Sequence, residues 1–362
     1  MEILEKIWEG NTVYQEPVCF SADGNGGAVG GKLLCPPKEI IKVCSYDGQI
    51  CYREGEDYLV EPWGIRRTGR SRIPFLPREV YCKQLVGHPE KAWLRLPGSQ
   101  HYIEVMPDVY RYQVLVTYRN AESWNGFTPE SQLSRLRHTA ERLRSGKELN
   151  LVFYGDSITA GWEASGADEW AIDRVDLSEY HVSIKRPPYM PAWAQLVTDE
   201  LKRCYPGCTI HKTNRAAGGS TTGWGLKNAT QLVNPCAPDL VILSFGMNCM
   251  QDPPEKFQAE IEGIIASVRE EYPLCEFLLV SPMIPNPEMA GFQNNQMVHH
   301  QERLAALCES HGGVGLAPVH SMFLQMSAYG KQYLELTGNC VNHPNDFSIR
   351  VYAQCVLTAL GL

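Results

Sequence analysis

The chain has 362 residues, of which 44% are apolar and 20% charged, and its formal net charge is −8. This composition is that of an ordinary globular protein and excludes disordered and collagen-like chains. The length predicts two domains, because single cores stop growing at roughly 250–300 residues. The absence of long basic runs argues against a nucleic-acid partner, and the absence of ~18 consecutive apolar residues argues against a membrane span.

The cysteines of the chain, thirteen in all, are scattered singly and include no Cys-x-x-Cys pair. This pattern matches neither a zinc ribbon nor a small disulfide scaffold. The first residues show neither the basic segment nor the apolar segment of a secretion signal. We therefore expect reduced thiols in a cytoplasmic protein without a metal site.

The first part of the chain, residues 1–125, contains short alternating or β-branched runs separated by Gly, Pro and Asp. Strands at this spacing predict an all-β jelly roll or sandwich. The runs expected to form strands are 39–46, 92–98, 101–107 and 110–119.

Residues 126–148 are expected to form a linking helix. The Thr-Pro-Glu sequence at 128–130 is a helix start signal, leucines follow at near-helical spacing, and Gly146 is expected to end the helix.

From residue 149 to 362, apolar strands alternate with amphipathic helices, which predicts a parallel sheet covered by helices on both faces. In such open sheets the ligand binds outside the carboxyl ends of the strands. The expected strands are 149–155, 208–214, 239–246 and 276–283, and the expected helices are 192–207, 254–273, 294–312 and 348–362.

Ser157 follows the first of these strands in "YGDSITAGW". At a strand-to-helix turn a serine exposes its hydroxyl and offers its backbone N–H to an oxyanion. Alternatively, Asp156 or Ser157 only caps a helix.

Two further blocks follow the second and third strands. "RAAGGSTTGW" contains Gly218 and Gly219, where a backbone could approach a ligand closely, although a plain glycine turn is the commoner outcome. "SFGMNCM" places Asn248 where its amide could donate to a developing negative charge, or where it is simply a turn residue.

The last block is "TGNCVNHPND", which contains His343 in front of the final helix. A single histidine is more often structural than catalytic. Its place near the carboxyl end of the sheet, after three other polar blocks in the expected order, makes it the candidate base.

Together these four blocks resemble those of the SGNH hydrolase superfamily, also called GDSL-type esterases and lipases, over about residues 149–362. The resemblance implies a flavodoxin-like three-layer α/β/α domain. It also implies ester hydrolysis through an acyl-enzyme, without a metal or organic cofactor. By the same resemblance, Ser157 is the nucleophile and His343 the general base. The oxyanion hole is then formed by the backbone N–H groups of Ser157 and Gly219 and the side chain of Asn248.

The chain departs from this family pattern at Cys340, which stands three residues before His343 where the family has an aspartate. A neutral thiol cannot stabilise an imidazolium as a carboxylate does. Three substitutes are open: a backbone carbonyl at or near Cys340, the carboxylate of Asp346, or a distant acid such as Asp252. We favour the carbonyl because it needs no chain rearrangement, and we expect Asp346 to cap the last helix, with Ser348 as its competitor.

The substrate is indicated by aromatic residues near the catalytic blocks. Trp162, Trp170 and Trp224 could stack on sugar rings or could be core aromatics. The charged insertion between Trp162 and Trp193 could line the site or form a subunit contact, as in a homo-oligomer.

A β-rich domain followed by an SGNH domain resembles carbohydrate esterase family two, which implies removal of O-acetyl groups from xylo- or manno-oligosaccharides. The alternatives are a short-chain acyl esterase, thioesterase or lysophospholipase-like enzyme for other small substrates, and a carbohydrate-binding protein with a degenerate hydrolase domain.

Overall fold

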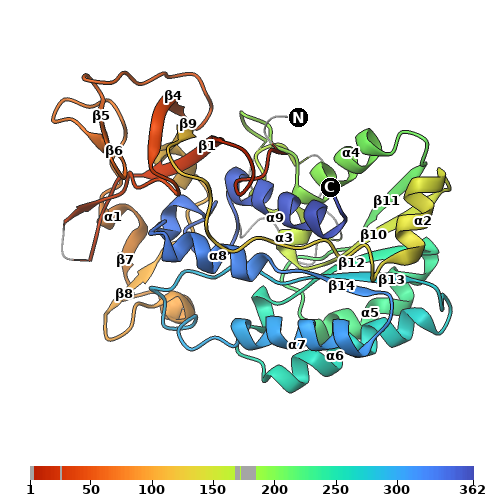
Figure 1. Cartoon of the computed structure of the whole chain (residues 1–362). Coiled ribbons are helices and arrows are strands. Elements are labelled where there is room, and N and C mark those ends of the chain that lie inside the picture. Colours follow the sequence, from red (N-terminus) through yellow and green to blue (C-terminus); the bar gives the residue numbers. More distant parts are fainter. Residues whose placement is uncertain (1–3, 25–26, 168–171, 173–184) are drawn as a thin grey trace.

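The computed structural model describes residues 4–24, 27–167, 172 and 185–362, in which an antiparallel β region precedes a parallel five-stranded sheet (Figure 1). This is the predicted order: an antiparallel N-terminal β region followed by an α/β domain of the SGNH type. In Figure 1 the two parts lie side by side, with the β region at the left.

The N-terminal part is built on a three-stranded antiparallel sheet with β9 in the middle, and three small two-stranded sheets surround it. The central sheet consists of β1 (Thr12–Cys19), β9 (Gln113–Asn120) and β4 (Pro37–Ser45). The small sheets are β2 (Ser21–Ala22) with β3 (Ala28–Val29), β5 (Tyr58–Glu61) with β6 (Gly64–Arg67), and β7 (Cys82–Gln84) with β8 (His101–Ile103). Short helical turns α1 (Arg78–Tyr81), η2 (Pro89–Leu94) and η3 (Val109–Tyr112) complete it.

One strand prediction in this part is wrong. Residues 92–98 were expected to form a strand, but residues 92–94 belong to the 3₁₀ helix η2 (Pro89–Leu94), and the residues after it form no regular strand. Proline at the start of a helix is favourable because its fixed φ suits the first turn. Leu94 therefore reaches the core from a short helix instead of from a strand.

The parallel sheet has the strand order β11-β10-β12-β13-β14, formed by β11 (Ile210–Asn214), β10 (Leu149–Gly155), β12 (Leu240–Ser244), β13 (Glu276–Val280) and β14 (Val314–Ala317). Numbered along the chain this is order 2-1-3-4-5, the flavodoxin-like arrangement, in which ligands bind where the strand order reverses. That point lies at the carboxyl end of β10, the strand that precedes Ser157.

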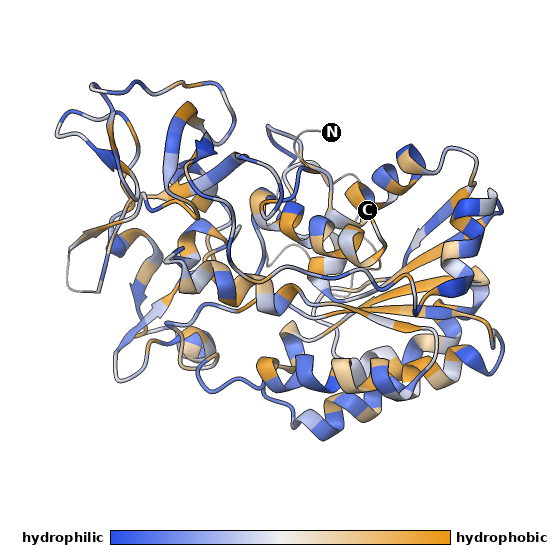
Figure 2. Ribbon diagram, viewed as in Figure 1, coloured by the Kyte–Doolittle hydropathy of each residue, from blue (hydrophilic) through white to orange (hydrophobic). Residues whose placement is uncertain are grey.

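Side chains of the central strands alternate between two cores. Leu151 and Phe153 of β10 belong to the core that also contains residues of α4 (Trp193–Cys204) and α9 (Asp346–Ala359). Val152 and Tyr154 belong to the core on the opposite face, and Figure 2 shows the apolar strands lying between the two helix layers. The opposite face is covered by α5 (Thr222–Leu232), α6 (Pro254–Arg269) and α7 (Met297–Ser310). This period-two burial on both faces explains why the strands are almost wholly apolar.

The linking helix is shorter than expected. It ends at Gly146 in the left-handed conformation, as predicted, but α2 begins only at Arg137 (Arg137–Ser145). The carboxylate of Glu276, at the start of β13, accepts the backbone N–H groups of His138 and Thr139 and so caps the first turn. A tertiary contact therefore sets this helix start.

Three elements in the C-terminal half were not predicted: α5, the four-residue strand β14 and α8 (Val319–Ala328). The strand β14 has four residues, fewer than the five to seven of the other strands in its sheet, and Pro318 follows it directly. The remaining short turns are α3 (Ser157–Ala160), η4 (Asn234–Cys236), η5 (Met247–Cys249) and η6 (Tyr333–Glu335). Among the described residues no helix has the length and apolar character of a membrane span.

A buried ion network joins the two parts of the chain. The Lys331 ammonium, with no exposed surface, lies 2.9 Å from a carboxylate oxygen of Glu16 and 3.2 Å from one of Glu335. It also donates to the carbonyl of Pro17 at 2.7 Å. Burial alone would lower the pKa of Lys331, but the two carboxylates outweigh it and the pKa is raised. The ammonium therefore stays charged and ties β1 to the region before the final helix.

We expect Lys331→Met to lower the free energy of unfolding by about 3–5 kcal/mol, because it leaves buried carboxylates without their cation. Urea unfolding followed by circular dichroism measures the change. Lys256→Met, which breaks a largely exposed pair with Asp252, is the control and should change the midpoint little. A midpoint for Lys331→Met equal to that of the control would contradict this account.

Candidate active site

Four elements bring the predicted residues to one edge of the sheet. Ser157 follows β10, Gly219 lies in the loop after β11, Asn248 follows β12, and His343 lies in the loop before α9. Because β10 is hydrogen-bonded to both β11 and β12, the first three loops are neighbours. The site therefore occupies the reversal point of the strand order.

Ser157 is the first residue of α3, and Asp156 is its N-cap. The Asp156 carboxylate accepts the backbone N–H of Ile158 at 3.1 Å. Burial raises the pKa of this carboxyl to about 7, although its backbone hydrogen bonds act in the opposite direction. Since Asp156 caps the helix, the Ser157 hydroxyl is not needed as a cap. Its Oγ lies 2.8 Å from Nε2 of His343.

The expected oxyanion donors lie around the same serine. Gly219 is exposed and has φ +67°, a conformation that L side chains rarely adopt. Asn248 is exposed as well, and its amide donates to the carbonyl of Ser220 at 2.9 Å, which ties the loop after β12 to the glycine loop. Within the described part of the chain, the backbone N–H groups of Ser157 and Gly219 donate to no protein acceptor. These donors are therefore available to an oxyanion.

We expect Asn248→Ala to reduce kcat by roughly 10²–10³ with little change in KM, because an oxyanion-hole donor acts mainly in the transition state. Steady-state kinetics on p-nitrophenyl acetate measure this. Asn228→Ala removes an amide that donates within helix α5 to the carbonyl of Trp224, and it is the matched control. A change in KM alone would show that Asn248 binds substrate instead.

His343 is buried, and burial lowers its pKa to about 4. The edge of the Trp162 ring packs against the imidazole, with ring centroids 5.5 Å apart. The imidazole is therefore neutral over the physiological range and can act as a base if Nε2 is free to accept a proton.

The residue that contacts the other ring nitrogen is Asn339, which the sequence analysis missed. Its Nδ2 lies 2.8 Å from Nδ1 of His343. Its Oδ1 accepts the backbone N–H groups of Val341, Asn342 and His343 at 2.9, 3.0 and 3.2 Å. These three bonds fix which end of the amide faces the ring, so Asn339 is a donor to Nδ1. In this arrangement Nε2 carries the imidazole proton and donates to Ser157.

The expectation that the Cys340 carbonyl orients the imidazole is corrected by this geometry. That carbonyl accepts from the side chain of Asn286 at 2.7 Å, and Cys340 itself has φ +69°. Its thiol is buried in the apolar core, and burial raises the pKa of the thiol. A search three residues before the histidine could not find Asn339, because the loop turn brings the residue four positions back onto the ring.

The two carboxylates considered as partners of the imidazole, those of Asp346 and Asp252, make other contacts. The Asp346 carboxylate accepts from the backbone N–H and hydroxyl of Ser165 at 3.0 and 2.6 Å. Nor does Asp346 cap α9, since the N-cap is Asn345, whose side chain accepts from the N–H of Ser348. Asp252 pairs with Lys256.

The three tryptophans predicted near the site have different outcomes. Trp162 lies at the site, against His343. Trp224 is partly buried on α5, packs on the core of the opposite helix layer and lies 6.0 Å from Tyr154 between ring centroids. Trp170, with most of the insertion before Trp193, lies outside the described residues.

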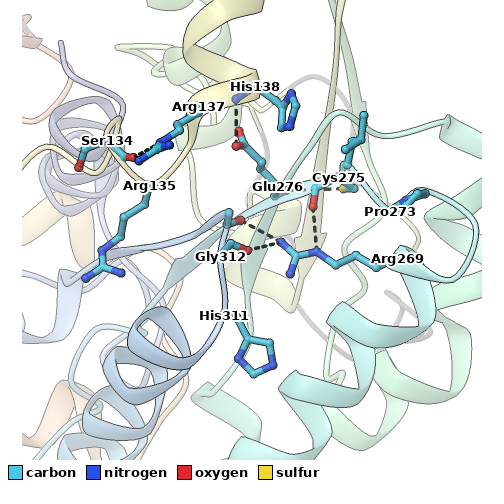
Figure 3. Close-up of a pocket in the computed structure, with 12 residues that line it drawn as sticks. Ser134, Arg135, Arg137, His138, Arg269, Pro273, Cys275, Glu276, His311 and Gly312 are labelled. Carbon is cyan, nitrogen blue, oxygen red and sulfur yellow. Dashed lines mark hydrogen bonds between the residues drawn. The ribbon is translucent and has the colours of Figure 1, made fainter.

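A separate hollow of about 490 Å³ lies at the opposite edge of the sheet, where β13 and β14 begin (Figure 3). Arg269 crosses it and donates to the carbonyls of Cys275 and Gly312. The guanidinium therefore links the loop before β13 to the loop before β14, at the amino ends of these two strands.

Among the described residues, no group of three or more His, Cys, Asp or Glu side chains could hold a metal ion.

Solved structures match parts of this chain at low sequence identity. A two-domain esterase active on acetylated mannans, co-crystallised with mannopentaose, is 22% identical with a TM-score of 0.46, over 66% of this chain and 55% of that one. This chain thus spans about half the length of that esterase. A variant of an acetyl xylan esterase from Geobacillus stearothermophilus is 17% identical with a TM-score of 0.44, over 59% of this chain and 94% of that one. No curated protein matches the sequence.

The family comparison covers the part of the chain that carries the site. The model of the GDSL-like lipase/acylhydrolase family matches residues 153–347, which is more than half of the chain and includes the loops of Ser157, Gly219, Asn248 and His343. The protein therefore belongs to the GDSL-like lipase/acylhydrolase family.

Proposed function

We propose that this hydrolase removes O-acetyl groups from carbohydrates through an acetyl-enzyme on Ser157. The observation that carries the serine mechanism is the 2.8 Å contact between Ser157 Oγ and His343 Nε2. Beside it lie the Asn248 amide and two backbone N–H groups that donate to no acceptor among the described residues. A nucleophile within hydrogen-bond reach of a base, next to oxyanion donors, is the arrangement that acyl transfer needs.

The reaction then runs in two halves. Ser157 Oγ attacks the acetyl carbonyl and its proton passes to His343 Nε2, while the carbonyl oxygen becomes an oxyanion held by the donors. Collapse breaks the ester bond, and the imidazolium returns the proton to the departing sugar hydroxyl. Water then attacks the acetyl-enzyme in the same way and releases acetate.

The first step requires an Nε2 without a hydrogen. In the structure Nδ1 accepts from Asn339, so the reactive tautomer forms when the amide turns its oxygen toward the ring, Nδ1 takes a proton from water and Nε2 releases its own proton to water. That turn breaks the three backbone hydrogen bonds to Oδ1, each worth about 0.5–1.5 kcal/mol. We infer that this step limits turnover.

A small acyl group is favoured by Trp162. Its ring stands against His343 on one side and Gly218 on the other, where a Cβ at residue 218 would lie only 2.8 Å from Cζ2 of the indole. The indole fills space between the base and the glycine loop that a long acyl chain would need.

Two substrate series test this proposal. Acetylated xylo- and manno-oligosaccharides are incubated with the protein and the products read by mass, and p-nitrophenyl esters from acetate to octanoate give the chain-length preference. We expect loss of acetyl groups from the oligosaccharides and fastest turnover of acetate. Fastest turnover of octanoate, or no deacetylation of any oligosaccharide, would refute the sugar substrate.

The cytoplasmic location and the homo-oligomer stay predictions.

A further inference from the structure

A small hollow of about 240 Å³ adjoins the candidate oxyanion hole. Asn248 and Met250 line it from the loop after β12, Gly291 and Phe292 from a later loop of the hydrolase domain, and Trp93 from η2 of the N-terminal region. Sites for drug-sized ligands usually measure ~300–1,000 Å³, so this hollow matches roughly one ring of a larger substrate.

Trp93 is exposed but firmly placed. Its side chain is 48% exposed, and its ring meets the buried Phe292 edge-on at 6.4 Å between centroids. Two residues further along, the carbonyl of Arg95 accepts the backbone N–H of Ala290 at 2.7 Å. At Gly291, a Cβ would lie 2.7 Å from the Trp93 carbonyl oxygen, so the two backbones are in close contact.

Two further contacts hold the loop of residues 288–292 in place, one from α1 and one from the loop after β12. Arg78 of the N-terminal region pairs with Glu288 at 2.7 Å. Gln251, next to Met250, donates to the carbonyl of Gly291 at 2.7 Å. The indole is therefore a fixed aromatic surface, and ligand binding does not have to order it, which reduces the entropic cost of binding.

We propose that Trp93 is a platform on which a pyranose ring of the substrate stacks while the ester of the same or the adjoining sugar lies at Ser157. An aromatic face binds the C–H groups of a sugar ring, and the exposed amides of Asn248 and Gln251 at the rim can bond its hydroxyls. This inference rests on the proposed carbohydrate substrate. It assigns the N-terminal β region a direct part in substrate binding.

The test compares Trp93→Ala with Trp63→Ala. Trp63 is similarly exposed, at 40%, and lies in the β5–β6 turn of the same region. For Trp93→Ala we expect KM for an acetylated oligosaccharide to rise roughly tenfold, as for loss of an aromatic anchor, while kcat/KM for p-nitrophenyl acetate stays unchanged. Trp93→Phe should recover most of the affinity, and Trp63→Ala should behave as the unaltered protein.

Equal loss on both substrates would show that Trp93 only supports the fold, and no change on either would show that it contacts no sugar; each result overturns the inference. The proposed function fails separately, if p-nitrophenyl acetate is turned over but no acetylated oligosaccharide is. In that case calorimetric titration with xylopentaose and mannopentaose decides: weaker binding by Trp93→Ala supports the platform, and equal or absent binding refutes it.

Discussion

Replacing Ser157 by alanine should abolish measurable acetate release, with a loss of roughly 10⁴–10⁶ in kcat. The change removes the atom that attacks the ester, while the oxyanion donors and the binding surfaces stay in place. The hydroxyl contacts Nε2 of His343, and the capping of α3 is done by Asp156, so the fold should be retained. Release of acetate from p-nitrophenyl acetate and from an acetylated oligosaccharide measures the loss.

The control for this variant is Ser145→Ala, an exposed serine at the end of α2, which should leave both activities unchanged. Circular dichroism and the urea midpoint confirm that Ser157→Ala is folded. Substantial acetate release by a folded Ser157→Ala protein would contradict the acetyl-enzyme mechanism. It would also contradict the pairing of Ser157 with His343 as nucleophile and base.

The second large effect is a gain: we expect Asn339→Asp to raise kcat at least tenfold. A carboxylate at this position can accept the three backbone N–H groups through one oxygen and the Nδ1 hydrogen of His343 through the other. It thereby holds the tautomer that accepts the serine proton and stabilises the imidazolium that forms. In serine proteases the reverse change, from acid to amide, costs ~10⁴ in kcat, which sets the upper bound.

The pH profile separates this positioning effect from a change in folding. Burial lowers the pKa of His343 to about 4, so the imidazole of the unaltered protein stays neutral, and kcat/KM should fall only as the pH approaches that value. A carboxylate beside Nδ1 favours the protonated ring and raises its pKa. The acid limb of the profile should therefore move to higher pH in Asn339→Asp while the plateau rises.

Asn342→Asp is the matched control, because it adds the same charge in the same loop. Its side-chain oxygen accepts from the Asn339 amide, so the added charge holds that amide in its present orientation as a donor to Nδ1. We expect no gain in kcat. Equal rates in Asn339→Asp and the unaltered protein, with unmoved acid limbs, would show that Asn339 does not control the imidazole.

The order of the two folds and the nucleophile block follow from local sequence. Nearly continuous apolar runs in 149–155 and 239–246 predict strands buried on both faces, and the amphipathic segments along the chain predict helices that cover them. Since parallel strands end at one edge, the polar residues after β10, β11 and β12 could be placed together without a structure. Ser157, Gly219, Asn248 and His343 do lie at that edge.

Contacts between distant parts of the chain decided the rest. The start of α2 depends on Glu276, which lies more than a hundred residues away, and residues 92–94 are helical where the N-terminal region meets the hydrolase domain. The partner of His343 depends on the hydrogen bonds of one loop, which turn the Asn339 amide toward the ring and leave the Cys340 carbonyl to Asn286.

The sequence by itself determined that Ser157, Gly219 and Asn248 meet at one sheet edge, because each follows a strand that an apolar run predicts. The resemblance of these blocks to the SGNH hydrolases indicated ester hydrolysis. The tertiary structure alone decided how the imidazole is oriented and which surface adjoins the oxyanion hole. The first depends on hydrogen bonds within the loop that holds both Asn339 and His343, and the second on the packing of Trp93 against Phe292 from a distant part of the chain. No periodic pattern encodes such contacts.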